Sequence, residues 1–234
     1  MTEPFLQYPK DYTLSTLEAN PKGTAIVSVS SGGTPSTKNG EYWGGNIPWL
    51  TPKEICYGRY VTFVSKTERS ITQKGLEKSG AKIQPPGTVM LTKRAPVGTA
   101  VVNTVPMTNN QGFLNFRCGA DLDPVYLCFW FRANKPYLET VANGSTYLEL
   151  YPGDLFEFVI GYPRIDEQKA VVRSLLSLEL AVSLGEVLET TADNLSGIDK
   201  IQRETQFLTS IKDEILIRLM SGEIRLKDLR GISW

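Results

Sequence analysis

The sequence contains no histidine. That absence excludes Ser-His-Asp and Cys-His activation of a nucleophile, and it removes the commonest zinc ligand. The three cysteines, Cys56, Cys118 and Cys128, show no CxxC spacing and follow no secretory leader, which indicates reduced cytosolic thiols. The most apolar run, residues 125–131, is far shorter than the roughly twenty residues that span a bilayer. We therefore expect a cytoplasmic chain without a membrane segment or a metal site.

Charge is balanced overall but not along the chain. Lys and Arg together number 25, as do Asp and Glu, so net charge neither indicates nor excludes a polyanionic partner. Residues 53–94 contain nine basic side chains against three acidic ones, whereas residues 166–234 contain nine basic and twelve acidic ones. The basic stretch fits contact with nucleic acid and a solvated protein face equally well.

The amino-acid composition of the chain changes near residue 165. Up to Pro163 it is rich in Gly, Pro, Ser, Thr and β-branched residues, which predicts many short strands and loops. Residues 126–131 fit a buried helix or a buried strand. The expected strands cover 25–30, 61–64, 88–92 and 99–102. The fold class is therefore α+β, with a globular mixed α/β domain over residues 1–165 and a helical region over 166–234.

A narrow apolar stripe marks the helical region. Asp166 and Glu167 place negative charge where a helix would begin. One continuous helix from residue 184 to residue 219 would be about 54 Å long, and it predicts a coiled coil with a partner helix because one small domain could not cover it. Gly185 and Gly197 are the points at which it could break, and Gly222 is the expected stop. The stripe consists of Leu184, Leu188, Leu195, Ile198, Ile201, Leu208, Ile211, Ile215 and Leu219.

Polar loops carry the candidate contacts to a polyanion. Gly32 and Gly33 would let the backbone approach a phosphate. Lys93 and Arg94 follow an expected strand and precede a turn, so both are expected to reach outward, where Arg94 could contact a guanine edge or simply hold a phosphate. Each loop also fits ordinary turn chemistry, and the first could be a surface loop pinned by nearby tryptophans. The candidate DNA-contacting residues are Thr34, Ser36, Lys38, Lys53, Arg59, Lys93, Arg94, Asn110, Gln111 and Thr146.

A series of short motifs covers nearly the whole chain. In order, they are Val29–Ser36, Tyr42–Trp43, Ile47–Trp49, Pro86–Val89, Ala95–Gly98, Asn110–Gly112, Gly144–Thr146, Asp166–Gln168 and Leu219–Arg225. Each motif is weak alone. The ordered set resembles the specificity subunit of bacterial type I restriction-modification enzymes.

That resemblance implies a target-recognition domain that reads double-stranded DNA, followed by a helix that docks on a methyltransferase subunit. A restriction subunit is a further candidate partner. S-adenosylmethionine, ATP and Mg²⁺ would belong to the partners, so this chain would hold no cofactor and no catalytic residue. Residues shared by such subunits would be scaffold rather than base readers, namely Gly32, Gly33, Pro35, Trp49, Gly112 and Gly144.

The resemblance departs from the family pattern in length. A full specificity subunit has two recognition domains and two helical regions, whereas this chain shows one of each. The chain is therefore expected to pair with itself, as a homodimer through the C-terminal helix, or with another half-length subunit.

Two other functions compete with this interpretation. One is a free-standing dimeric DNA-binding protein, such as a decoy, that works without a methyltransferase. The other is a DNA-modifying enzyme, but the chain has neither an Asn-Pro-Pro-aromatic nor an Asp-Pro-Pro-aromatic motif. Asp154 with Glu167 and Lys169 loosely matches a nuclease pattern in which acids bind Mg²⁺. That match is short, and its second half falls at the expected helix start.

Overall fold

The structure, a computed structural model, describes residues 8–56, 62–94, 96–142, 149–156, 158–191 and 195–225. For residues 187–191 and 195–201 it describes the backbone alone. The chain forms two compact units, the first over Leu14–Ile160 and the second from Gly161 onward. This division lies close to the expected boundary at residue 165. The second unit also includes residues 8–13, which the sequence did not suggest.

A five-stranded sheet lies at the centre of the first unit. Its strands, in the order in which they pair, are β2 (Ile26–Ser31), β9 (Phe113–Cys118), β6 (Val89–Thr92), β7 (Ala100–Asn103) and β4 (Phe63–Val64). Neighbours are antiparallel except β4, which runs parallel to β7. Every residue of β6 and β7 is buried, as expected for short apolar strands inside a sheet. The sequence-based prediction of β2, β6 and β7 is confirmed to within a residue at each end.

Smaller elements surround this sheet. A three-stranded sheet has the order β5 (Arg69–Ile71), β3 (Trp43–Leu50) and β8 (Thr108–Asn109), and β1 (Thr13–Thr16) pairs with β10 (Val159–Tyr162). The short helices are η1 (Gly40–Tyr42), α1 (Lys53–Cys56), α2 (Gln73–Glu77), α4 (Lys135–Val141) and α5 (Pro152–Phe156). A hydrophobic cluster that includes Leu50, Met90, Met107 and Phe113 joins both sheets from inside.

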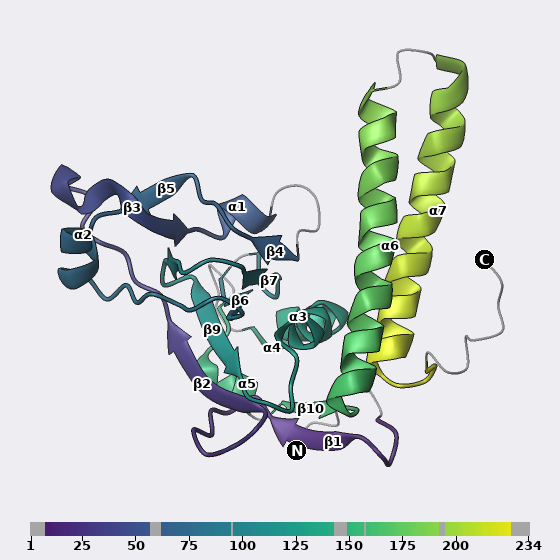
Figure 1. Cartoon of the computed structure of the whole chain (residues 1–234), viewed down its shortest axis with the longest axis horizontal. Helices are drawn as coiled ribbons and strands as arrows, with labels where there is room; N and C mark the ends of the chain where they lie inside the picture. Colours follow the sequence, from purple (N-terminus) through teal and green to yellow (C-terminus); the bar gives the residue numbers. More distant parts are fainter. Residues whose placement is uncertain are drawn as a thin grey trace. The chain divides into compact units, whose positions relative to one another are not determined.

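The apolar run at 125–131 is a helix. It belongs to α3 (Pro124–Ala133), which packs against β6 and β7 (Figure 1). Asp123 caps α3 by accepting hydrogen bonds from the backbone N–H groups of Val125 and Tyr126, and Pro124 suits the first turn. Periodicity could not separate helix from strand here because residues 126–131 are all buried.

The helical unit is a hairpin. Two helices, α6 (Ile165–Thr191) and α7 (Leu195–Met220), lie side by side and run in opposite directions (Figure 1). The expected continuous helix from residue 184 to residue 219 is therefore wrong, and neither Gly185 nor Gly197 interrupts its helix. The apolar spacing fitted both arrangements, because two helices of one chain can cover each other as well as helices of two chains can.

The residues of the predicted apolar stripe are consequently divided between α6 and α7. On α6, Leu184 is 58% exposed, whereas Leu219 on α7 is 1% exposed. Three stripe residues on α7, Leu208, Ile211 and Ile215, are half-buried. The stripe side chains that lie outside the described part are Leu188, Leu195, Ile198 and Ile201.

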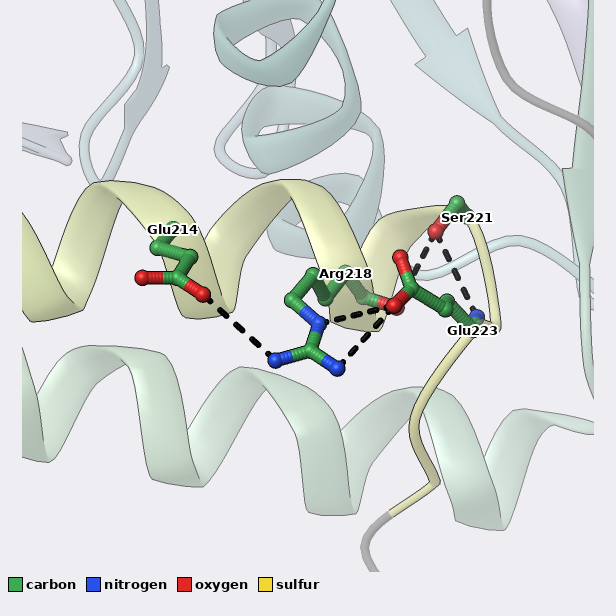
Figure 2. Close-up of polar contacts among 4 residues, drawn as sticks. All are labelled: Glu214, Arg218, Ser221 and Glu223. Atoms are coloured by element: carbon green, nitrogen blue, oxygen red, sulfur yellow. Dashed lines mark hydrogen bonds and ion pairs between the residues drawn. The ribbon is translucent and has the colours of Figure 1, made fainter.

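The end of α7 is closed as the sequence predicts. Gly222 has a φ of 71°, a left-handed conformation that glycine adopts readily after a helix. Figure 2 shows the polar contacts at this end, where the Arg218 guanidinium lies between Glu214 and Glu223. Its Nε donates to the Glu223 carboxylate over 3.0 Å, and the Ser221 hydroxyl donates to the Arg218 carbonyl over 3.1 Å. These contacts fold the chain after Gly222 back onto the last turn.

Residues 8–13 belong to the helical unit through contacts with this closed end. Arg225 donates to both carboxylate oxygens of Asp11, one of them over 2.7 Å. Tyr12 lies beneath the same guanidinium, and burial raises the pKa of its hydroxyl to about 12. A Cβ at Gly222 would lie only 2.6 Å from the Pro9 ring. The N-terminal segment therefore completes the base of the hairpin.

Gly185 provides a test of the hairpin. A Cβ at this position would lie 2.5 Å from the Thr205 hydroxyl on α7, so Gly185→Ala should fail to give the gain of about 1 kcal/mol expected from helix propensity. In a Thr205→Ala background the same substitution should stabilise the protein by about that amount. The free energy of unfolding in urea for the four proteins gives the coupling, expected at about 1–3 kcal/mol. Equal effects in both backgrounds would contradict the close packing of α6 on α7.

Candidate nucleic-acid interface

Four polar segments of the first unit meet around residues 109–112. The Gly33 N–H donates to the Asn109 carbonyl over 2.9 Å, and the Asn110 N–H donates to the Leu50 carbonyl over 3.0 Å. The Lys93 N–H donates to the Gly112 carbonyl over 2.8 Å. Loops that are far apart in the sequence thus form one surface region, called here the reading edge, made of residues 33–38, 51–53, 93–94 and 110–112.

Strand direction explains why these loops converge. β2 and β6 are both antiparallel to β9, and their last residues, Ser31 and Thr92, pair with Leu114 and Phe113 at its start. β3 runs parallel to β8, so both end together beside the same turn. Loops that carry binding residues are positioned by the rigid strands before them. The reading edge is therefore defined by sheet register.

A pair of buried amides fixes the turn at the centre. Asn109 Nδ2 donates to Asn115 Oδ1 over 2.5 Å, and Asn115 Nδ2 donates back to Asn109 Oδ1 over 3.2 Å. Both residues are at most 1% exposed. A reciprocal pair satisfies buried polar groups that would otherwise be costly, so it ties β8 to β9 across the turn that joins them.

The residues expected to be scaffold are buried or closely packed against other backbone where the structure describes them. A Cβ at Gly32 would collide with the backbone of Asn109 and Asn110, and one at Gly33 would collide with the backbone of Gly80. The Trp49 indole N–H donates to the Gly33 carbonyl over 2.9 Å, and the Trp43 indole N–H donates to that of Ser36 over 3.2 Å. The first loop is therefore pinned by both tryptophans. Of the other scaffold candidates, Pro35 and Gly112 are buried, and Gly144 lies outside the described residues.

The candidate contact residues around this scaffold are mostly accessible. Ser36, Lys38, Lys53 and Gln111 are exposed, while Thr34 and Asn110 are half-buried. The Thr34 hydroxyl donates to the Gln111 side-chain carbonyl and so joins two of the loops. The Asn110 side chain accepts from the Gly112 N–H over 2.9 Å, which supports its role as a turn residue.

The side chain of Lys53 is exposed at the surface. The neighbouring Glu54 carboxylate accepts hydrogen bonds from the backbone N–H groups of Thr51, over 2.8 Å, and Glu68, over 2.6 Å. That carboxylate therefore serves the local chain fold, and Lys53 remains exposed beside it.

Lys93 differs from the expectation that it reaches outward. Its side chain is 14% exposed, and its Nζ lies 3.1 Å from the Glu149 carboxylate. Arg94 is 49% exposed and pairs with the second oxygen of Glu149 through Nε, over 3.0 Å. Burial opposes ionisation of Glu149, but Lys93 and Arg94 together outweigh it and lower the pKa of the carboxyl. The sequence could not show this pairing because Glu149 lies far along the chain.

Arg69 is a candidate that the sequence did not single out. Its guanidinium carbon lies 3.6 Å from the ring centroid of Trp43 and 5.4 Å from that of Trp49, whose rings meet edge to face. The side chain is exposed and has no acidic partner among the described residues. Stacking on an aromatic ring leaves the N–H donors of arginine available. Arg69 had been counted only as part of the basic stretch.

Two candidates, Arg59 and Thr146, lie outside the described residues, so their contacts remain predictions. The nuclease pattern gains no support: Asp154 lies on α5 and Glu167 on α6, and the described residues include no group of three acidic or cysteine side chains placed to hold a metal ion. None of the described helices is long and apolar enough to cross a membrane.

Comparison with known proteins connects this arrangement with one family. A model of the type I restriction modification DNA specificity domain matches residues 24–188. The chain is 38% identical over 169 residues to the type I restriction enzyme MjaIX specificity subunit of Methanocaldococcus jannaschii. That match covers 71% of this chain but only 38% of the other protein. The chain therefore spans less than half the length of this curated relative.

Solved structures share the fold. The HsdS subunit from Thermoanaerobacter tengcongensis matches with a TM-score of 0.53 at 18% identity, over 94% of this chain and 45% of that one. A chain from a structure concerning complex assembly and conformational transition of the type I R-M system matches with a TM-score of 0.58, also at 18% identity. That match covers 95% of this chain and 49% of the other chain.

Asn115 tests whether the amide pair supports the reading edge. Asn115→Leu keeps the size of the side chain but leaves the buried Asn109 amide without its partner, so the free energy of unfolding should fall by about 1–3 kcal/mol. The matched control is Asn46→Leu on β3, where the side chain is exposed. Urea denaturation compares the two variants. An Asn115 variant as stable as the control would show that the amide pair contributes nothing.

Proposed function

Because the chain belongs to the type I restriction-modification DNA specificity family, we propose that it recognises a DNA sequence and directs a methyltransferase to it. The observation that carries the proposal is the reading edge, where polar and cationic side chains from separate loops surround a rigid, buried turn. Sequence-specific recognition needs this combination, because base contacts must be held in fixed positions relative to one another.

The side chains of the reading edge fall into two chemical groups. Lys38 and Lys53, together with Arg69 of β5 outside the reading edge, are exposed cations suited to phosphate oxygens, which fix position on the duplex. The Gln111 amide and the Arg94 guanidinium have the donor geometry that base edges require. We assign Lys93 a structural role, because its charge is paired with Glu149 inside the unit.

In this proposal the chain carries no reaction step. S-adenosylmethionine, ATP and Mg²⁺ belong to the methyltransferase and to any restriction subunit that joins it. When the purified chain is incubated with S-adenosylmethionine and DNA, methylation of the DNA should therefore be detected only after a methyltransferase subunit is added. Co-purification of the two subunits would separate this function from that of a free-standing decoy, which would bind DNA and retain no methyltransferase.

The hairpin is the proposed assembly surface. Leu180 and Leu184 are 72% and 58% exposed and lie one turn apart on α6, while Phe207 on α7 is 64% exposed. We propose that a second copy of the chain covers these side chains. A two-fold axis would then present identical reading edges to inverted half-sites, so the DNA target would be an interrupted palindrome.

Lys53 tests the phosphate contacts. Lys53→Ala should weaken binding to any duplex and lower the slope of log affinity against log salt by about one, because one fewer counterion is released. The matched control is Lys22→Ala. Lys22 precedes β2, and the reading edge follows the other end of that strand, about 17 Å away at about 3.3 Å per residue. Fluorescence anisotropy with a non-specific duplex at several salt concentrations gives both slopes, and equal slopes for the two variants would exclude Lys53 as a contact.

The exposed leucines test the dimer. Leu180→Asp combined with Leu184→Asp should make the chain monomeric, because the interface would bury unpaired charge. These positions are better choices than Leu208 and Ile215, which are half-buried within the chain. Ile83→Asp, at a side chain 47% exposed in the first unit, is the control. Light scattering at micromolar concentration measures the mass; a monomeric parent chain would refute the homodimer.

A further inference from the structure

Glu149 holds two cations of the reading edge at once. Its Oε1 lies 3.1 Å from Lys93 Nζ, and its Oε2 lies 3.0 Å from Arg94 Nε. The backbone fixes the same arrangement, because Arg94 and Glu149 form an antiparallel β-bridge and the Leu150 N–H donates to the Lys93 carbonyl over 2.8 Å. The carboxylate and the two cations are therefore locked to each other by main chain and side chain together.

Exposure increases across this group. The side chains of Lys93 and Glu149 are 14% and 19% exposed, whereas that of Arg94 is 49% exposed. Lys93 balances the charge of Glu149 in the less accessible part. The Arg94 guanidinium is the part of this group that solvent reaches. Lys93, Arg94 and Glu149 together carry one net positive charge, and it lies on this guanidinium.

The atom through which Arg94 is held determines what it can do. Guanidinium is planar, with five N–H donors in fixed directions. Since Nε is bound to Glu149, the two terminal nitrogens form the part of the fork that remains for a ligand. Holding the plane in advance reduces the conformational entropy lost when both donors are used together.

The residue before Arg94 joins it to the central turn of the reading edge. The Lys93 N–H is bonded to the Gly112 carbonyl, so Arg94 follows immediately after the contact with the turn that carries Gln111. A carboxylate at this place is unfavourable for attraction to phosphates, because it cancels one positive charge of the edge. It is favourable for aligning a fork with a base, and guanine offers O6 and N7 to two parallel donors.

We infer that Glu149 is a positioning residue that presents Arg94 to a guanine, and that Arg94 reads one base pair of the target. This inference rests on the proposed DNA-recognition function. It predicts that Glu149 and Arg94 determine the same position in the target, and that Glu149 acts on specificity rather than on overall affinity.

The test is a selection from a pool of duplexes with a randomised central segment, followed by sequencing. The unmodified full chain is compared with three full-length variants: Glu149→Gln, Arg94→Lys and the control Glu139→Gln. The control removes the same charge from an exposed i,i+4 pair with Lys135 on α4. Thermal unfolding shows that each protein is folded. Arg94→Lys changes an accessible side chain and keeps its charge, so it tests the inference even where Glu149→Gln does not fold.

We expect the full chain and the control to enrich one sequence. Glu149→Gln should bind unselected DNA at least as tightly as the full chain, because a negative charge is lost. It should nevertheless lose about 10-fold or more of its preference for guanine at one position and keep the others. Arg94→Lys should lose preference at that same position.

Other outcomes overturn the inference in distinguishable ways. Unchanged preferences in both variants, or a uniform change at all positions, would mean that the group acts only through its charge. Losses at two different positions would mean that Glu149 does not act through Arg94. If the full chain enriches no sequence, the proposed function itself fails, and the inference fails with it.

Discussion

The register between β9 and its neighbours is the constraint on which the reading edge depends. β2 and β6 end beside the start of β9. The reciprocal amide pair of Asn109 and Asn115 holds the turn between β8 and β9 in place. A shift of one residue would turn every side chain of a strand to the opposite face. It would also separate the Gly33, Asn110 and Lys93 backbone contacts that bring the loops together. The proposed sequence recognition would therefore depend on sheet pairing, with the loops supplying chemistry at positions that the strands define.

Local signals in the sequence were sufficient for some elements, such as β2, β6 and β7, and insufficient for pairing. Short apolar strands such as β6 and β7 could be predicted because burial and flanking turn residues are local properties. The hairpin could not, since the spacing of apolar residues on α6 and α7 is the same whether the covering helix comes from this chain or from another. Lys93 and Arg94 looked equivalent in sequence. Glu149 makes them different, because it covers one cation and orients the other. Stacking of Arg69 on Trp43 was likewise invisible, although both residue types had been noted.

Buried residues and exposed candidate contact residues alternate along the same short loops. Gly33 is enclosed by backbone, while Thr34 beside it reaches the side chain of Gln111. Glu54 satisfies backbone donors, while Lys53 remains exposed. Such alternation lets the exposed residue change without loss of a buried hydrogen bond, because each role belongs to a different side chain. A target-recognition domain with this construction can acquire a new specificity at little cost in stability.

Glu149, the acid that pairs with two cations of the reading edge, follows from the same division of roles. A surface selected only for affinity to DNA would gain from every additional positive charge, since each phosphate contact releases a counterion. Specificity is instead a difference between affinities for right and wrong sequences, and uniform attraction adds nothing to that difference. Glu149 lowers the attraction common to all sequences and fixes the direction of one donor fork. Both effects increase the contribution of base contacts relative to backbone contacts, so a carboxylate placed behind an arginine favours discrimination even though it opposes binding.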